Sequence, residues 1–202
     1  MLGLIQRALY PLPTAPRFTL PTPEDYVDLL DDGRDFAPAA VLIGIVEREP
    51  GNPVIVLTRR TDLLSKHPGQ VALPGGRVDV SDVDEVAAAL REAQEEIGLH
   101  PSHVRPLGFI DPIRTFTGFR VVPVVALIDA AHESRPCADE VAEVFEVPLS
   151  YVLDPRSVRK VEADFQGRVR HYWQYDFAGQ RIWGATASML VNLRDRIAAL
   201  RG

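Results

Sequence analysis

The sequence predicts an α/β fold in which helices cover both faces of a mixed β-sheet. Apolar, β-branched runs occur at residues 39–46, 54–58 and 119–128, a composition typical of strands buried on both faces. One amphipathic helical pattern follows the second run, and another occupies residues 182–200. Strands and helices alternate along the chain, and this order favours a sheet sandwiched between helices.

The N-terminal 35 residues are expected to wrap a domain formed by residues 36–202. Their prolines keep much of the segment extended, and a short helix is expected at residues 23–30. These prolines are Pro11, Pro13, Pro16, Pro21 and Pro23. A chain of 202 residues is long enough for one domain with a substantial core.

The remaining elements follow from apolar runs and turn signals. Glu49-Pro50-Gly51-Asn52-Pro53 separates the first two strands, as in a hairpin. Further strands are expected at residues 104–110, 119–128, 144–148 and 168–177, the last as one arm of a hairpin, with a short helix at 149–153. The final helix should bury Met189 and Trp183. The polar loop 111–118 either presents Arg114 near the site or is simply solvated.

The most informative stretch is residues 73–99, where a Pro-Gly-Gly turn runs into a helix. Glu92, Glu95 and Glu96 fall on one face of this helix as a carboxylate patch. The opposite face carries an apolar stripe of Val86, Leu90, Ala93 and Ile97. Neighbouring carboxylates repel each other, and a hard divalent cation with oxygen ligands would relieve that repulsion.

Two interpretations of this acidic helix stay open from the residues alone. It is either a solvated helix face or a site for metal-dependent phosphate chemistry. Arg91 lies one turn before Glu95 and is expected to orient its carboxylate by a forked hydrogen bond. Asp82 and Glu85 are expected to form a capping box at the start of the helix, as N-cap and N3.

The stretch resembles the Nudix box, the signature of hydrolases of nucleoside diphosphates linked to another moiety. The match comprises Gly76 and the run Arg91-Glu92-Ala93-Gln94-Glu95-Glu96-Ile97-Gly98-Leu99. The sequence departs from the pattern in three places. Ala93 occupies a position that is usually larger, the spacing from Gly76 to Arg91 is one residue longer, and Asp82 stands where Glu is expected. The resemblance implies a Nudix-like α/β/α sandwich with a mixed sheet.

A second motif upstream resembles the signature of the coenzyme A diphosphatase branch of this family. It consists of Leu57-Thr58-Arg59-Arg60, Ser65-Lys66-His67-Pro68-Gly69-Gln70 and Leu73-Pro74-Gly75-Gly76, with Leu73 where Phe is usual. That branch also tends to have the longer spacing and the Asp. Its basic residues form a cluster suited to phosphates. The expected substrate-binding residues are Arg59, Arg60, Lys66, His67, Arg77 and Arg114.

The resemblance also implies a Mg²⁺ or Mn²⁺ site and its ligands. Glu92 and Glu96 are the first choice, with Glu95 sharing a bridging ion and the Gly76 carbonyl as a further ligand. The expected catalytic residues are Arg91, Glu95, Glu96 and Glu140. Glu140 falls where related enzymes place a downstream glutamate, and the choice of general base among Glu95, Glu96 and Glu140 stays open.

Composition argues against several classes of protein, among them nucleic-acid-binding, disulfide-bonded and membrane proteins. The net charge of −6 argues against nonspecific nucleic-acid binding, which needs a basic surface. One cysteine, Cys137, excludes an intrachain disulfide and fits a reducing compartment. With no long apolar run and a poor secretory signal, the chain is expected to be cytoplasmic, with no membrane partner, and to act as a monomer or homodimer.

The expected function is metal-dependent hydrolysis of the pyrophosphate bond of coenzyme A or a derivative. The products would be 3′,5′-ADP and 4′-phosphopantetheine or its acyl form. One alternative is a Nudix diphosphatase for ADP-ribose or another nucleoside diphosphate derivative. The other is a nucleotide-binding regulator without catalysis, although such domains tend to lose the box glutamates that this chain retains.

Overall fold

The centre of the computed structural model is an eight-stranded mixed sheet. The model describes residues 1–23, 26–30, 33, 35–63 and 68–200. The strands are β1 (Ala37–Glu49), β2 (Asn52–Arg60), β3 (Val71–Ala72), β4 (Gly75–Arg77), β5 (Val104–Phe109), β6 (Ile113–Arg114), β7 (Phe119–Ile128) and β8 (Val141–Pro148). Their order is β3-β2-β1-β7-β5, while β4 pairs with β1, β6 with β7 and β8 with β2.

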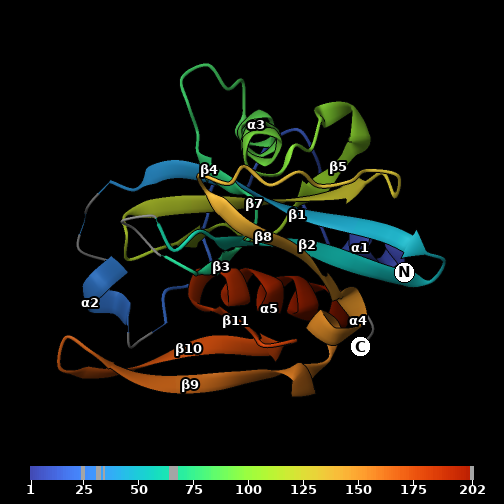
Figure 1. Ribbon diagram of the computed structural model, residues 1–202. Helices are drawn as coiled ribbons and strands as arrows, with labels where there is room; N and C mark the ends of the chain where they lie inside the picture. Colours follow the sequence, from blue (N-terminus) through green and yellow to red (C-terminus); the bar gives the residue numbers. More distant parts are fainter. Residues whose placement is uncertain (24–25, 31–32, 34, 64–67, 201–202) are drawn as a thin grey trace.

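Helices lie on both faces of this sheet, as predicted. Helix α3 (Glu85–Ile97) covers one face and α5 (Gly184–Ala198) the other (Figure 1). The sheet is mixed because β1 and β7 run parallel, whereas the other strand pairs are antiparallel. The expected hairpin of β1 and β2 is present, with both strands longer than the apolar runs alone predicted.

Strand β1 shows how the two faces are filled. Ala40, Leu42 and Val46 belong to the core on the α3 side, whereas Ile43 and Ile45 belong to the core on the α5 side. Side chains alternate between the faces of a strand, so a run that is apolar at nearly every position is buried on both sides. This is why the continuous apolar runs correctly predicted the central strands.

Helix α3 packs on the sheet through small residues. Ala88, Ala89, Ala93 and Ile97 are fully buried. The predicted stripe is therefore correct for Ala93 and Ile97, whereas Val86 and Leu90 are only partly buried at its margin. Alanines let the helix backbone approach the sheet closely, which brings the box helix down onto β1 and β4.

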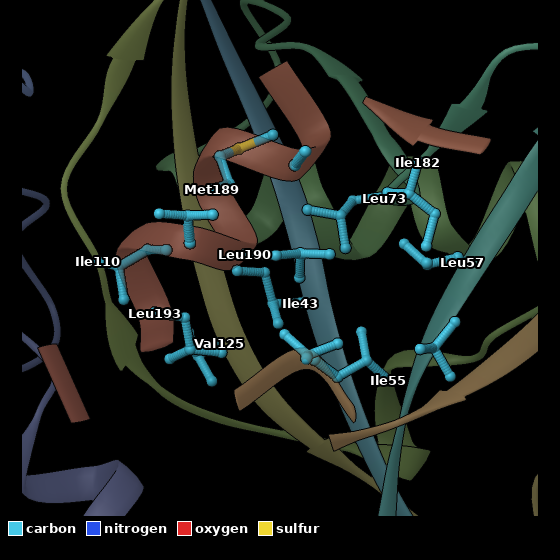
Figure 2. Close-up of a cluster of buried hydrophobic side chains, with 14 of the residues drawn as sticks. Ile43, Ile55, Leu57, Leu73, Ile110, Val125, Ile182, Met189, Leu190 and Leu193 are labelled. Atoms are coloured by element: carbon cyan, nitrogen blue, oxygen red, sulfur yellow. The ribbon is translucent and has the colours of Figure 1, made fainter. Parts of the chain in front are cut away.

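The larger core lies between the sheet and α5. Figure 2 shows Met189, Leu190 and Leu193 on this helix pointing toward Ile43, Ile55 and Val125 of the strands. Met189 is core, as expected. Trp183 lies at the end of a strand before the helix, is only half-buried, and packs edge-on against Tyr172. The predicted helix 182–200 therefore begins later than expected.

A small antiparallel sheet follows α4 (Leu149–Leu153), the short helix that the sequence predicted. It contains β9 (Val158–Phe165), β10 (Arg168–Phe177) and β11 (Gln180–Trp183) in the order β11-β10-β9. Strand β10 is one arm of the expected hairpin, and β9 and β11 had not been predicted. Figure 1 shows β9 and β10 beyond α5. Short 3₁₀ turns occupy Pro101–His103 and Pro155–Ser157.

The N-terminal segment runs along the domain. It contains α1 (Leu2–Arg7), which the sequence did not predict, and α2 (Val27–Leu30) within the expected helical stretch. Ile5 and Ala8 are buried in the core on the α5 side, and Tyr10 forms a β-bridge with Phe109. The half-buried Tyr10 hydroxyl donates to Asp111 at 2.9 Å. Among the described residues, no helix is long and apolar enough to span a bilayer.

Candidate active site

The box helix begins two residues later than the sequence suggested. Asp84 is the N-cap, and its carboxylate accepts from the Ala87 amide at 2.8 Å. The predicted capping box of Asp82 and Glu85 is therefore wrong. Asp82 instead bonds to Arg91, and Glu85 lies 4.0 Å from the Arg120 guanidinium. Glu85 occupies the first turn of the helix, where a negative charge is favourable.

Two glycines let the loop pass close under the helix. A side chain at Gly75 would lie 2.4 Å from the Ala40 carbonyl oxygen, and this residue has a φ of +148°. A Cβ at Gly76 would lie 2.6 Å from the Glu92 carboxylate. Glycine is the residue that tolerates both demands, because it has no side chain and adopts positive φ freely. The backbone of Gly76 is thus held against Glu92.

The three glutamates of α3 occupy three different environments. Glu96 has a side chain that is 6% exposed, that of Glu92 is 18% exposed and that of Glu95 is 58% exposed. They do not form the uniform carboxylate patch expected from helical periodicity. Glu96 turns toward the loop and the sheet, whereas Glu95 stays at the surface. The two less exposed members, Glu92 and Glu96, are the ones whose pKa values are raised.

Glu96 is the most perturbed carboxyl of the site. One of its oxygens accepts from the Gly75 amide at 3.2 Å, and the other lies 3.9 Å from Arg60 Nη1. Burial, with a smaller contribution from the Glu92 charge, raises the pKa of Glu96 from 4.5 to about 7, although the Gly75 amide and Arg60 act to lower it. A carboxyl with this pKa exchanges a proton near neutrality, which suits a group that must bind cations or protons.

Glu92 and Glu140 surround Glu96 with negative charge. Burial raises the pKa of Glu92 despite a hydrogen bond from Arg91, and the charges of Glu95 and Glu140 add to the rise. Glu140 is exposed, and its carbonyl accepts from the Thr61 amide at 2.9 Å, which places it beside the end of β2. The Glu140 charge also raises the pKa of Glu96. The structure thus brings this downstream residue within electrostatic reach of the box glutamates.

Arg91 joins the loop to the helix. Its guanidinium makes the forked pair of hydrogen bonds with Asp82, at 3.1 and 3.0 Å. It also donates to Glu92 at 3.0 Å, to Glu95 at 3.2 Å and to the Arg77 carbonyl at 3.0 Å. Asp82 holds the pKa of Arg91 well above its usual value, and Arg91 lowers that of Asp82. The sequence correctly predicted the Arg91–Glu95 contact, but the fork goes to Asp82.

The predicted substrate-binding cations are not all in one place. Arg60 is the one nearest to Glu96, and its buried Nε has no hydrogen-bond partner among the described residues. Arg59 pairs with Asp62 and Glu143, and Arg77 lies over the Phe119 ring. Arg114 donates to Thr22 at 2.8 Å, so it faces the N-terminal segment and not the glutamates. Lys66 and His67 lie outside the described residues.

The oxygen atoms of the site suit a hard divalent cation. No three His, Cys, Asp or Glu side chains in the described ranges form a preassembled metal cluster. Glu92 nevertheless packs on the Gly76 backbone in a space that a Cβ would fill, and Glu96 meets the same loop one residue earlier. Two carboxylates with raised pKa values beside a glycine backbone form a suitable donor set for such an ion.

Sequence reasoning missed the contacts made by backbone atoms. The Gly75 amide that holds Glu96 and the Arg77 carbonyl that holds Arg91 have no side-chain signature. Asp82 was found, but with the wrong role. Asp82 precedes Arg91 by nine residues, and this spacing predicts an ion pair only if the loop is known to fold back on the helix.

Comparison with known proteins identifies the fold and the family. A model of the NUDIX domain matches residues 36–165. An uncharacterized Nudix hydrolase NudL from Enterobacter sp. (strain 638) is 39% identical over 181 residues, covering 90% of this chain and 91% of the relative. A protein of the same name from Citrobacter koseri is 42% identical over 159 residues, covering 79% and 82%.

Solved structures agree on the fold. The MutT/nudix family protein from Enterococcus faecalis superposes with a TM-score of 0.51 at 16% identity, covering 83% of this chain and 64% of that one. The Deinococcus radiodurans protein DR0079 superposes with a TM-score of 0.52 at 15% identity, covering 80% and 86%. At these identities the likeness shows the fold alone.

Proposed function

The chain belongs to the Nudix hydrolases, which cleave phosphoric anhydride bonds in nucleoside diphosphate derivatives, and we propose that its substrate is coenzyme A or an acyl derivative. Cleavage of the pyrophosphate would yield 3′,5′-ADP and 4′-phosphopantetheine or its acyl form. The observation that carries the proposal is the arrangement around Glu96. This buried carboxylate lies between the Gly75 amide and Arg60, next to Glu92 and Gly76.

The branch signature supports coenzyme A over other family substrates. Its apolar members, Leu57 and Leu73, are buried, while Arg59 and Arg60 lie at the end of β2 that adjoins the glutamates. The buried Nε of Arg60 is a donor without a partner in the described chain, and a phosphate oxygen would satisfy it. An arginine in this position can neutralise one end of a diphosphate, while a cation held by the carboxylates would neutralise the other end.

Glu92, Glu96 and the Gly76 carbonyl are the groups that would hold a divalent cation. Nudix hydrolases generally use such ions, and Mg²⁺ or Mn²⁺ suits an all-oxygen donor set. When bound, the ion neutralises the diphosphate charge that repels an incoming nucleophile. Arg91 orients Glu92 and Glu95, since its guanidinium donates to both carboxylates and also to the Arg77 carbonyl.

The proton of the attacking water needs a carboxylate acceptor. Glu95 is the weaker candidate, because its carboxylate is already engaged by a hydrogen bond from Arg91 at 3.2 Å. Glu140 is exposed, and its charge is felt by both Glu92 and Glu96. We therefore assign the general base to Glu140 and the metal-ligand role to Glu92 and Glu96. Replacement of Glu140 by Gln tests this assignment through the pH profile of kcat.

The test of the substrate is a product analysis. The protein is incubated with Mg²⁺ or Mn²⁺ and with coenzyme A, ADP-ribose or NADH in parallel, and the products are separated by chromatography. Metal-dependent release of 3′,5′-ADP from coenzyme A is the expected result. Preferential cleavage of ADP-ribose or NADH would retain the diphosphatase chemistry and contradict the coenzyme A assignment. Binding of these nucleotides without cleavage would contradict catalysis.

A further inference from the structure

A pocket of about 370 Å³ lies on the α5 side of the molecule. Its walls come from four separate segments, represented by Leu20, Thr115, Trp173 and Ser188. A volume of this size is in the range of small-molecule sites, and a mostly apolar wall with a few polar groups is their usual character. None of the α3 glutamates is among the described residues that line it. The pocket is therefore distinct from the carboxylate site.

Most of the wall lies outside the residues matched by the NUDIX domain model. The NUDIX domain match ends at residue 165 and begins at residue 36, whereas Leu20, Tyr26, Trp173 and Ser188 fall before or after it. Chemistry common to a family belongs to its shared domain, and specificity is carried by sites added to that fold. A pocket built largely from residues outside the NUDIX domain match is therefore a natural place to select the substrate.

The pocket lies within reach of the catalytic loop. Strand pairing aligns Arg77 with Ala39, Ala39 with Val121 and Val121 with Ile113, and Ile113 lines the pocket. Three steps between neighbouring strands span about 14 Å. A substrate held at Gly76 could therefore extend into the pocket.

Direct contacts follow the same course. The Arg77 guanidinium lies 5.6 Å from the centre of the Phe119 ring. The Phe119 amide donates to the Thr115 hydroxyl at 3.2 Å, and Thr115 lines the pocket. The path from the glutamates to the pocket thus runs along Gly76, Arg77, Phe119 and Thr115, and it crosses β1, which lies between β4 and β7.

The pocket offers apolar surface together with uncommitted polar groups. Phe116 and Trp173 supply aromatic surface, and Val191 supplies aliphatic surface. The half-buried Ser188 makes no side-chain hydrogen bond with the described residues, and Lys160 at the rim has no ion-pair partner among them. A ligand with a branched apolar group and amide or hydroxyl groups along a narrow chain would match this lining.

We propose that this pocket binds the pantetheine arm of the substrate, an inference that rests on the proposed coenzyme A activity. The arm has a gem-dimethyl group for the apolar wall, and a hydroxyl and two amides for groups such as Ser188. A chain of about twelve single and amide bonds is on the order of 15 Å long when extended. This length is close to the span of about 14 Å across the strands from Arg77 to Ile113, which lines the pocket.

The first experiment fills the pocket by Ser188→Phe, with Ser150→Phe on the exposed surface of α4 as the matched control. Kinetics are measured on coenzyme A and on dephospho-coenzyme A, which carries the same arm but lacks the 3′-phosphate. Ser188→Phe is expected to raise KM for both substrates equally, by at least about tenfold, and to change kcat much less. A rise for coenzyme A alone would assign the pocket to the 3′-phosphate and overturn the proposal, as would no rise.

The second experiment measures binding without catalysis. Pantetheine, which has no pyrophosphate, is titrated into the wild type and both variants by calorimetry, with circular dichroism and thermal melting to establish that each variant is folded. Binding to the wild type and the Ser150→Phe control, and its loss in Ser188→Phe, are expected. If coenzyme A is cleaved but pantetheine does not bind, the pocket assignment is wrong while the activity stands. If coenzyme A is not cleaved, the proposed function itself fails.

Discussion

The two faces of the sheet carry sites that are built in opposite ways. On the α3 face, the carboxylate site takes most of its groups from the short continuous stretch Gly75 to Glu96, to which only Arg60 and Glu140 are added from elsewhere among the groups proposed above. On the α5 face, the pocket takes walls from residues as far apart as Leu20 and Ser188. The first site consists of charged groups that are held by hydrogen bonds. The second is a largely apolar space in which Ser188 is a polar group without a side-chain hydrogen bond to the described residues.

This difference shows how catalysis and selectivity are divided in the molecule. A site that must hold several like charges needs short-range control, because a shift of one group changes the pKa of the others. The loop and helix provide that control within one local unit joined by Arg91. A pocket that selects a substrate can be assembled from distant segments, because apolar contact tolerates variation. Changes to the α3 face should therefore abolish turnover, and changes to the α5 face should shift affinity.

The largest effect is expected from Glu96→Gln, which removes the buried charge but keeps the shape. The catalytic rate kcat should fall by about 10³-fold, since a bound metal ion contributes several kcal/mol to catalysis and Glu96 is proposed to hold it. Steady-state kinetics on coenzyme A measure the loss. Glu133→Gln, an exposed carboxylate in the loop after β7, is the control and should retain full activity. Half of the wild-type rate in Glu96→Gln would show that the carboxylate is not required.

The same substitution should stabilise the metal-free protein at neutral and alkaline pH. The pKa of Glu96 is raised from 4.5 to about 7 in the folded state, so the wild type loses stability as the pH rises from about 4.5 to 7. A glutamine avoids this loss, and the gain in free energy of unfolding should be on the order of 3 kcal/mol above pH 7. Denaturant unfolding at pH 8 and pH 4 in the presence of a chelator provides the measurement.

At pH 4 the two proteins should have nearly equal stability, because Glu96 is then protonated in both the folded and the unfolded chain. Added Mg²⁺ should raise the melting temperature of the wild type more than that of the variant, since binding to the folded state stabilises it. A variant that is less stable than the wild type at pH 8 would show that Glu96 is not destabilised by its surroundings.

The smallest effect is expected on the other face, at the ion pair that fastens the hairpin to the N-terminal segment. Arg170, with a side chain 2% exposed, binds both carboxylate oxygens of Asp28 at 2.8 and 2.9 Å. Arg170 lowers the pKa of Asp28 to about 2, so the pair persists throughout the neutral range. Asp28→Asn weakens this attachment beside the pocket and should raise KM for coenzyme A about threefold, with little change in kcat.

The control for this change is Asp154→Asn, which removes an equivalent bidentate pair with the exposed Arg156 at the start of β9. That pair is solvated and far along the hairpin from the pocket, so KM should not change. A fall in kcat as large as that of Glu96→Gln after Asp28→Asn would contradict the division between the two faces.

Much of the fold could be predicted because local pattern and burial agree. The runs of β1 and β7 are apolar on both faces and lie at the centre of the sheet. The small sheet was harder, because β9 alternates polar and half-buried residues and β11 has four residues that continue into α5 without a break in helical spacing. Helix α1 was missed because its few turns are stabilised by packing of Ile5 and not by any local signal.

The sequence by itself determined the mixed α/β class, the box helix and the Glu92, Glu95 and Glu96 set, because helical spacing and glycine turns are local properties. Only the tertiary structure decided that Glu96 is buried while Glu95 is exposed, that Asp82 binds Arg91 instead of capping the helix, and that Arg114 faces the N-terminal segment. Periodicity places side chains on a face but cannot tell how deep that face lies. The depth of a face depends on which distant segments pack against it, and that depth sets the pKa values of its side chains. The pocket on the α5 side likewise exists only because distant segments meet there.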